Sequence, residues 1–180
     1  MNFEQLATQG RSKVAKSMAA AVSGKQLIAM RKKNLQSCFD DFYGKLHRLE
    51  YVASVHNIRY IDDAKSENIN ATWYSLESMS DNVIWITMSN DDTFDYAKIT
   101  DLIMHKVKCI ICVGNGESVK RAVGGYVRSF VEVDNIEDAV MYSFNISKSG
   151  YTVLFSPACK TKNATYEELG KEFHKAVNMI

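Results

Sequence analysis

A short polar segment, residues 62–72, carries the side chains best suited to chemistry. It reads Asp62-Asp63-Ala-Lys65-Ser-Glu67-Asn68-Ile-Asn-Ala-Thr72. It lies between an apolar run and a run with helical spacing, so an acid, an amine and free backbone N–H groups meet at the end of a strand. Open α/β sheets bind ligands at this edge. The segment predicts a ligand-binding loop, and a polar loop that only caps the helix is the alternative.

The histidines give a weaker signal. They are His47, His56, His105 and His174. Each stands alone in the sequence, without the neighbours of a metal site or a nucleophile triad. We predict surface or boundary positions for most of them, and no metal site. One segment that periodicity does not explain is His47-Arg48-Leu-Glu50, just before a predicted hairpin.

Two further patterns favour structure over chemistry. Cys109 and Cys112 lie three apart in an apolar run, where strand positions face opposite sides, and no second Cys/His pair has zinc spacing. We predict buried structural cysteines. Gly114-Asn-Gly116 follows this run, but Val119 stands where a dinucleotide fingerprint needs a small residue. A tight turn is favoured over a free-standing nucleotide-binding domain.

No ATP phosphate loop is encoded in these 180 residues. The Gly-Lys pairs begin at residues 24, 44 and 170, and they are followed by Gln, Leu and Glu. The phosphate-binding pattern needs Ser or Thr there, because that hydroxyl binds the magnesium ion.

Short apolar runs alternate with helical spacing in most of the chain. Buried strands are predicted over 83–86, 107–113, 129–133 and 151–155, with helices over 96–106, 117–123 and 136–145. Residues 49–55 and 58–61, joined at His56-Asn57, predict an antiparallel hairpin. The predicted fold is α/β: a Rossmann-like, mostly parallel sheet flanked by helices, with that hairpin and an N-terminal helical arm.

Cap residues and further helical segments complete the predicted elements. Helices are predicted over 13–22, 27–42 and 72–79, the last with Asn68 or Asn70 as its cap. Capping boxes are predicted at Asp134/Glu137 and Thr165/Glu168, the second opening the final helix.

Composition narrows the function classes. The chain has 46% hydrophobic and 24% charged residues and a net charge of +1, which predicts an ordinary globular domain and gives no reason to expect a nucleic-acid partner. No run reaches the roughly 18 apolar residues of a membrane span. Four cysteines do not make a disulfide scaffold, so we expect a reduced, cytoplasmic protein. Residues 1–40 carry seven basic and two acidic side chains, which marks a basic arm.

Three segments follow one another along the chain: His-Arg-Leu-Glu at 47–50, the segment 62–72, and Phe-Ser-Pro-Ala-Cys-Lys-Thr at 155–161. They resemble His-Arg-x-Glu, Asn-Asp-Ser-Lys-Ala-Thr-Asn-x-x-Ala-Thr and Leu-Ser-Pro-Ala-Cys-Ala-Ser in the C-terminal domain of the Mur ligase family, in its D-glutamate-adding members. By this resemblance residues 43–180 are a Mur ligase C-terminal-like domain. Residues 1–42 form a helical arm that is similar to the end of the family's central domain.

The resemblance implies a lobe that closes over an ATP-binding domain. The complete enzymes activate the carboxylate of UDP-N-acetylmuramoyl-L-alanine as an acyl phosphate, and D-glutamate attacks it, in peptidoglycan synthesis for the cell wall. The implied cofactor is ATP with Mg²⁺, held mainly by a domain that this chain lacks and that must be supplied in cis or in trans. The implied partners are the UDP-muramoyl substrate and the amino acid, with no nucleic acid and no membrane.

The resemblance also implies roles for single residues. Arg48 would reach the ATP phosphates and Asp63 the ribose, while Lys65 would be the catalytic cation that stabilises developing charge. The implied substrate-binding residues are Asn68, Ser156 and Thr161.

Two positions depart from the family pattern. Asp92 stands where the family has a lysine that grips the glutamate side chain, and Glu67 replaces a threonine that contacts the amino acid. Exchanging a cation for an anion about 4 Å from a carboxylate reverses an interaction of roughly 4 kcal/mol at an effective dielectric near 20. A ligase lobe that works only alongside other domains is therefore one hypothesis, and a degenerate, non-catalytic binding or scaffolding module is the alternative. Under either hypothesis we expect no ligase activity from the isolated chain.

Overall fold

The computed structural model describes residues 46–88, 95–161 and 163–180. The helices predicted over 13–22 and 27–42, and Asp92, lie outside the described residues. The described residues all belong to the unit Tyr43–Ile180. The boundary between residues 42 and 43 as a division between arm and domain stays a prediction.

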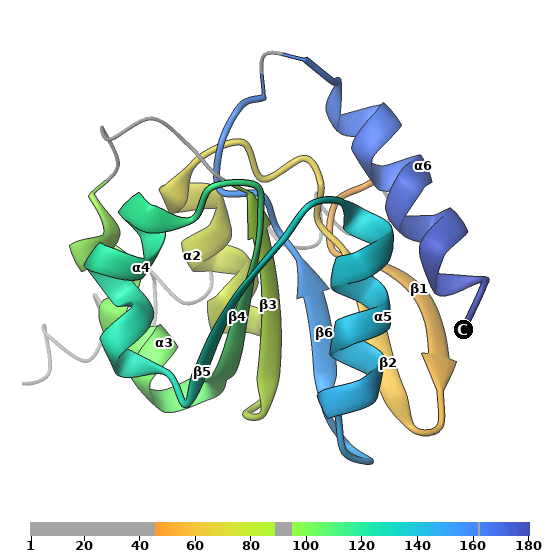
Figure 1. The fold of residues 1–180 in the computed structure, drawn as a ribbon, viewed down its shortest axis with the longest axis horizontal. Helices are drawn as coiled ribbons and strands as arrows, with labels where there is room; N and C mark the ends of the chain where they lie inside the picture. The colour runs from red at the N-terminus through yellow and green to blue at the C-terminus, as the bar shows by residue number, and fades with distance from the viewer. Residues whose placement is uncertain (1–45, 89–94, 162) are drawn as a thin grey trace, which may run out of the picture. The chain divides into compact units, whose positions relative to one another are not determined.

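A six-stranded sheet forms the centre of this unit, in the order β1-β2-β6-β3-β4-β5 (Figure 1). The strands are β1 Glu50–Val55, β2 Ile58–Asp62, β3 Val83–Met88, β4 Val107–Val113, β5 Ser129–Val133 and β6 Thr152–Phe155. Only β1 runs antiparallel to its neighbour, and the pairs from β2 to β5 are all parallel. The predicted mostly parallel sheet with one hairpin is confirmed.

Helices cover both faces of the sheet (Figure 1). They are α2 Ile69–Ser78, α3 Thr100–Lys106 after the 3₁₀ turn η1 Tyr96–Ile99, α4 Glu117–Val123 before η2 Gly124–Tyr126, α5 Ile136–Ile146 and α6 Tyr166–Val177. Side chains of α5 and α6 pack on one face, and those of α2, α3 and α4 on the other. In the described part of the chain, no helix combines the length and apolarity needed to cross a bilayer.

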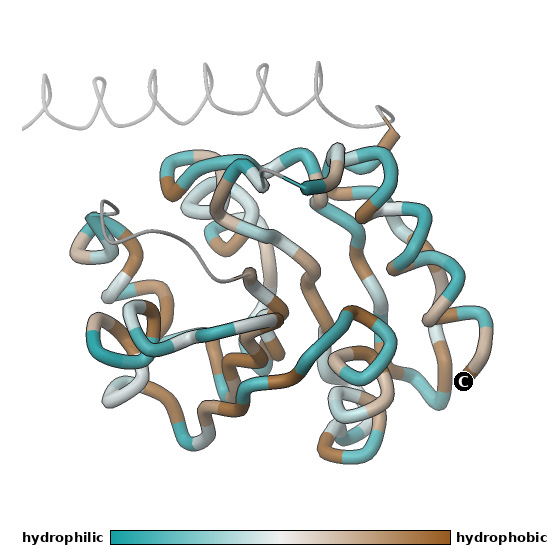
Figure 2. Tube along the Cα trace, turned by 45° about the horizontal axis from the view of Figure 1, so that its top comes forward, coloured by the Kyte–Doolittle hydropathy of each residue, from teal (hydrophilic) through white to brown (hydrophobic). Residues whose placement is uncertain are grey.

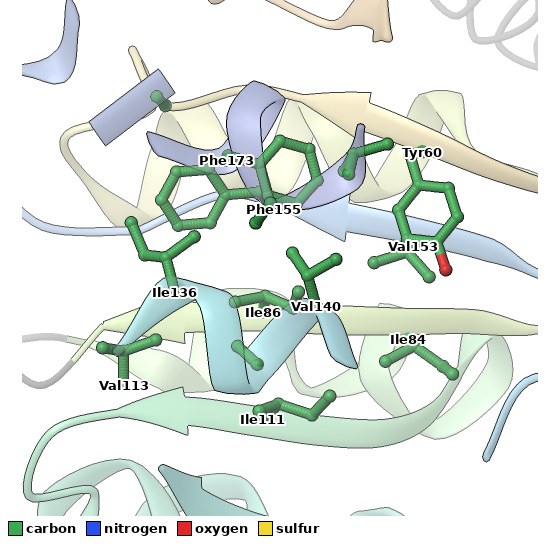
Figure 3. Packing of buried hydrophobic residues seen from close by; sticks show 14 of the residues in the cluster. Tyr60, Ile84, Ile86, Ile111, Val113, Ile136, Val140, Val153, Phe155 and Phe173 are labelled. Atoms are coloured by element: carbon green, nitrogen blue, oxygen red, sulfur yellow. The ribbon is translucent and has the colours of Figure 1, made fainter. Parts of the chain in front are cut away.

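Each strand supplies both halves of the core because alternate side chains face opposite sides. In β4, Cys109 and Ile111 join the cluster under α5 and α6, whereas Ile110 and Cys112 join the other. The predicted burial of both cysteines on opposite faces is confirmed. Figure 3 shows the first cluster, in which Phe155 lies beside Phe173 of α6, their ring centroids 5.1 Å apart. Along the chain, hydrophobic residues gather on the central strands and hydrophilic ones on the loops (Figure 2).

The β1–β2 hairpin follows from its two turn residues. His56 and Asn57 have φ angles of 50° and 63°. Two consecutive residues in this region make the turn that matches the twist of paired strands. Asn57 also donates a hydrogen bond to Ser149 Oγ at 2.7 Å, which ties the turn to the loop before β6.

The helix caps are mostly as predicted. Thr165 and Glu168 form a capping box at the start of α6, and Asn68 caps α2 by accepting from the Ala71 N–H at 2.9 Å. The predicted capping box at Asp134 and Glu137 is wrong. Asn135 caps α5 instead, accepting from the Asp138 N–H at 2.7 Å, so the cap lies one residue later than predicted while the helix begins at Ile136 as predicted.

The glycines after β4 serve packing. Gly114 turns the chain at a φ of 88°. A Cβ placed on Gly116 would lie 2.9 Å from Cys112 Cβ and from Phe130 Cζ, so only glycine lets α4 approach the sheet this closely. The tight turn favoured by the sequence accounts for this segment.

Candidate functional site

The site lies at the carboxyl ends of β2 and β6, which are neighbours in the sheet. Asp62 pairs with Phe155, so the polar segments that follow each strand start side by side. The Asp63 N–H donates to the Phe155 carbonyl at 2.8 Å, and the hydroxyls of Thr72 and Ser156 are 2.9 Å apart. The segment 47–50 joins them through a hydrogen bond from the Lys65 N–H to the His47 carbonyl at 3.0 Å. The structure thus brings the three chemistry-bearing segments together.

Asp63 is the centre of the hydrogen bonds at this edge. It is fully buried and accepts from the hydroxyls of Ser66 and Ser75 and from the Leu49 N–H at 3.3 Å. Burial raises the pKa of Asp63 to about 6, although the serine hydrogen bonds and the positive charge of Arg48 act in the opposite direction. The carboxyl group therefore organises the loop from inside.

Arg48 is held in place by the same network. Its Nε lies 3.9 Å from Asp63 Oδ1, and its Nη1 donates to Ser66 Oγ at 3.0 Å. The residues on either side, His47 and Leu49, have φ angles of 60° and 46°. Such left-handed conformations cost about 1–3 kcal/mol each for residues other than glycine and persist where the surroundings enforce them. The backbone strain and the ion pair with Asp63 together fix the position of the Arg48 side chain.

Lys65 is an exposed cation of the site. Its Nζ lies 4.8 Å from the ring centroid of Tyr166, the first residue of α6. A lysine ammonium over an aromatic face is attracted by the ring but keeps its freedom to move. The ammonium group is therefore restrained and still available to an anionic ligand.

A cavity of about 490 Å³ lies between this lysine's loop and the start of α6. It is lined by Glu67, Lys160, Thr161, Asn163, Ala164, Thr165, Tyr166, Glu167 and Glu168. The Thr161 hydroxyl donates to the Ala164 carbonyl at 2.5 Å. Burial raises the pKa of the Cys159 thiol to about 11, and the negative charge of Glu67 contributes to this increase. Three glutamates against one lysine make the lining acidic, which favours a cationic group over a second carboxylate.

The side chains that fix the loop after β6 were not predicted from the sequence. Trp85 donates its indole N–H to the Ser156 carbonyl at 2.8 Å, and Thr87 donates to the Pro157 carbonyl at 3.0 Å. Both belong to β3 and are fully buried. In the sequence they stand inside an apolar run, which signals core packing and not support of a site.

The predicted surface or boundary positions hold for three of the four histidines, and His47 is buried. Two histidines that stand alone in the sequence nevertheless meet in the fold. His47 and His174, far apart in sequence, have ring centroids 5.5 Å apart and meet at Asp62. His47 is buried, and its Nδ1 lies 2.6 Å from Asp62 Oδ2. Packing of α6 against the hairpin brings them together, and no local pattern announces such a contact.

Comparison with known proteins found no family model that matches the chain, but it found similar ligases. The chain is 37% identical over 183 residues to the UDP-N-acetylmuramoylalanine–D-glutamate ligase of Christiangramia forsetii, and 34% identical over 184 residues to that of Bacteroides thetaiotaomicron. Both matches cover all of this chain but 41% of the relative, so the chain spans about two fifths of the length of these relatives.

A solved structure agrees at the level of the fold. The murein peptide ligase of Psychrobacter arcticus superposes with a TM-score of 0.51 at 12% identity, over 74% of this chain and 30% of that one. The described unit therefore has a fold like that of a Mur ligase C-terminal domain. Over its full length the chain is homologous to part of D-glutamate-adding Mur ligases, which are enzymes of peptidoglycan synthesis.

Proposed function

We propose that this chain is the C-terminal lobe of a ligase that adds an amino acid, D-glutamate in its relatives, to UDP-N-acetylmuramoyl-L-alanine with ATP. The observation that carries the proposal is the single polar site formed by segments 47–50, 62–68 and 156–161 at one edge of the sheet. The similarity of this whole chain to about two fifths of each D-glutamate ligase supports it.

The cations at this edge suit a nucleotide phosphate. Arg48 offers a planar guanidinium group whose direction is set by Asp63 and Ser66, and Lys65 offers an exposed ammonium group. When bound, ATP supplies the phosphoryl group that activates the substrate carboxylate, and Mg²⁺ balances its charge. Most of that binding falls to a further domain, in cis or in trans. We propose that Arg48 contacts the phosphates.

Asp63 acts on the nucleotide through Arg48 in this proposal. Because its oxygens already accept three hydrogen bonds inside the protein, it keeps the guanidinium group oriented. The direct contact with a ribose that the resemblance implied stays a prediction.

Lys65 is the residue that we propose stabilises developing negative charge. A fixed cation does this well once lobe closure excludes water. Asn68, Ser156 and Thr161 are the proposed residues on the substrate side, because all three lie in the segments that converge at this edge. Their side chains now contact Ala71, Thr72 and Ala164, and these contacts would hold them in place for a ligand.

The acidic cavity favours a second candidate. Glu67, Glu167 and Glu168 line the hollow next to Lys65, where a dicarboxylate would meet like charge. A non-catalytic lobe that serves as a binding or scaffolding module fits this lining.

A chimera separates the two candidates. Residues 1–180 replace the matching two fifths of the Christiangramia forsetii ligase, and ATP-dependent phosphate release is measured with UDP-N-acetylmuramoyl-L-alanine and D-glutamate. We expect activity that Lys65→Ala lowers at least about 100-fold in kcat, whereas Lys148→Ala, in the exposed loop before β6, has no effect. Should the folded chimera stay inactive even with Glu67→Thr, the ligase role is refuted and the module remains.

A further inference from the structure

We propose that His47, Glu50, Asp62 and His174 form a binding site for a divalent transition metal, with zinc the best match. The site lies next to Arg48 and to the loop that carries Lys65. The proposal does not depend on the proposed ligase role. The site joins the turn before β1, the two hairpin strands and α6, which are distant in sequence.

The spacing of the four ligand atoms suits one small ion. One nitrogen or oxygen from each side chain lies within 4.8 Å of all the others. Asp62 Oδ2 is 2.6 Å from His47 Nδ1 and 2.9 Å from His174 Nε2, and Glu50 Oε2 is 3.9 Å from His174 Nε2. Ligands at tetrahedral corners about 2.0–2.1 Å from zinc stand roughly 3.3 Å apart. The observed distances lie on both sides of this value, and the widest separation, within 4.8 Å, has to shorten by up to about 1.5 Å to complete the site.

The charge of the cluster calls for a cation. Two carboxylates with two neutral imidazoles carry a formal charge of −2, and Asp62 is fully buried. Among residues 46–88, 95–161 and 163–180, the ion pairs of Asp62 and Glu50 involve only the two histidines. A buried carboxylate is costly unless a positive charge or hydrogen bonds compensate it. A divalent ion neutralises this set.

The donor types select the metal. Imidazole nitrogen with carboxylate oxygen suits zinc, whereas calcium and magnesium prefer sets made only of oxygen. The carboxylates are also oriented by outer hydrogen bonds, as in established metal sites. Asp62 Oδ1 accepts from the Ala64 N–H at 2.9 Å, and Glu50 Oε2 accepts from the His47 N–H at 2.7 Å.

Two features of α6 point into the cluster. The His174 Nε2 atom is buried and makes no aligned hydrogen bond, although Asp62 is near. One turn earlier, a Cβ placed on Gly170 would lie 1.9 Å from His47 Nδ1, so only glycine leaves room for the ring at this position. The helix thus admits one imidazole and directs an unpartnered nitrogen of the other at the same point.

The test is metal binding by the purified 180-residue chain. Zn²⁺ affinity is measured by competition with a chromophoric chelator, in the parent and in His174→Gln and Glu50→Gln. Both changes remove one ligand at a partly exposed position, so the fold is expected to persist, as circular dichroism checks. We expect at least a tenfold loss of affinity for each, and none for His105→Gln or His56→Gln, which alter exposed histidines outside the cluster. The melting temperature should rise with Zn²⁺ in the parent and rise less in the two ligand variants.

Substitution by Co²⁺ identifies the donors. The visible spectrum should be that of a four-coordinate nitrogen and oxygen site, without the near-ultraviolet band of a cobalt–thiolate bond. A thiolate band would move the metal to the cysteines and overturn the proposal. So would equal affinity of the His174→Gln and His105→Gln variants, or no Zn²⁺ binding at 100-fold excess over the protein. In that case the cluster is a hydrogen-bonded brace alone.

Discussion

Asp63 shows how one buried carboxyl group can organise the loop around it. It accepts hydrogen bonds from two serines and a backbone N–H, and it pairs with Arg48. Burial disfavours its charged form, while these partners favour it. Burial has the larger effect, because the pKa rises to about 6. The protonation of Asp63 is therefore coupled to stability.

Asp63→Asn should change how stability depends on pH. The folded chain keeps a proton on Asp63 that the unfolded chain releases between pH 4 and 6, so ionisation lowers the free energy of unfolding as pH rises through this window. The full effect is about 3 kcal/mol. The variant lacks this loss, so its stability relative to the parent should increase from pH 4 to pH 7 in urea unfolding. Asp101→Asn, at an exposed helix position, is the control, and parallel curves for all three proteins would contradict the prediction.

Trp85→Phe should weaken the support beneath Ser156. The change keeps an aromatic ring in the core but removes the N–H that the buried Ser156 carbonyl accepts at 2.8 Å. Leaving such a group unpaired costs about 1–3 kcal/mol. Urea unfolding should show this loss, with a smaller one for Trp73→Phe, whose side chain is partly exposed. Equal losses would mean that the hydrogen bond contributes nothing beyond ring packing.

Helix α6 is the element that connects the two sites. Its capping box fixes where it begins, next to Lys65, and its inner face packs Phe173 on Phe155. On the same helix, Gly170 and His174 contact the His47 ring and Asp62. The helix thus sets both the wall of the acidic cavity and one side of the proposed metal site.

Gly170→Ala should destabilise the protein, against its helix propensity. Alanine is favoured over glycine inside a helix by about 1 kcal/mol. Here the added Cβ would lie 1.9 Å from His47 Nδ1, so the buried ring must move. We expect a net loss of about 1–3 kcal/mol in urea unfolding, as for other overpacked cores. Gly125→Ala, where a Cβ meets nothing within 4 Å, is the matched control. A stabilised Gly170→Ala variant would show that His47 is not held by α6.

At the scale of the whole molecule, the proposed function makes this site one half of a complete active site, and a further domain supplies the other half. Arg48 and Lys65 offer cations, but the sequence contains no Gly-Lys pair followed by Ser or Thr to hold ATP phosphates. The relatives are more than twice as long as the matched region. A cation such as Lys65 stabilises developing negative charge strongly only when a second surface excludes water from the site.

The isolated 180-residue chain should therefore show no ligase turnover. Purified protein is incubated with ATP, Mg²⁺, D-glutamate and UDP-N-acetylmuramoyl-L-alanine, and product is sought by mass spectrometry. The intact Christiangramia forsetii ligase serves as the positive control. Any product formed in proportion to the amount of this chain, and lost in Lys65→Ala, would show that the lobe is sufficient by itself.

The sequence by itself determined what depends on neighbours along the chain. Runs such as 107–113 predicted buried strands because β-branched residues fit a sheet, and Thr165 with Glu168 predicted a cap because their bonds are local. It also predicted that the polar segment 62–72 follows the end of a strand, and β2 does end at Asp62. The tertiary structure alone decided that His174 meets His47 and that Trp85 supports Ser156. Contacts between distant elements depend on packing angles and register, and no periodicity in the sequence records these.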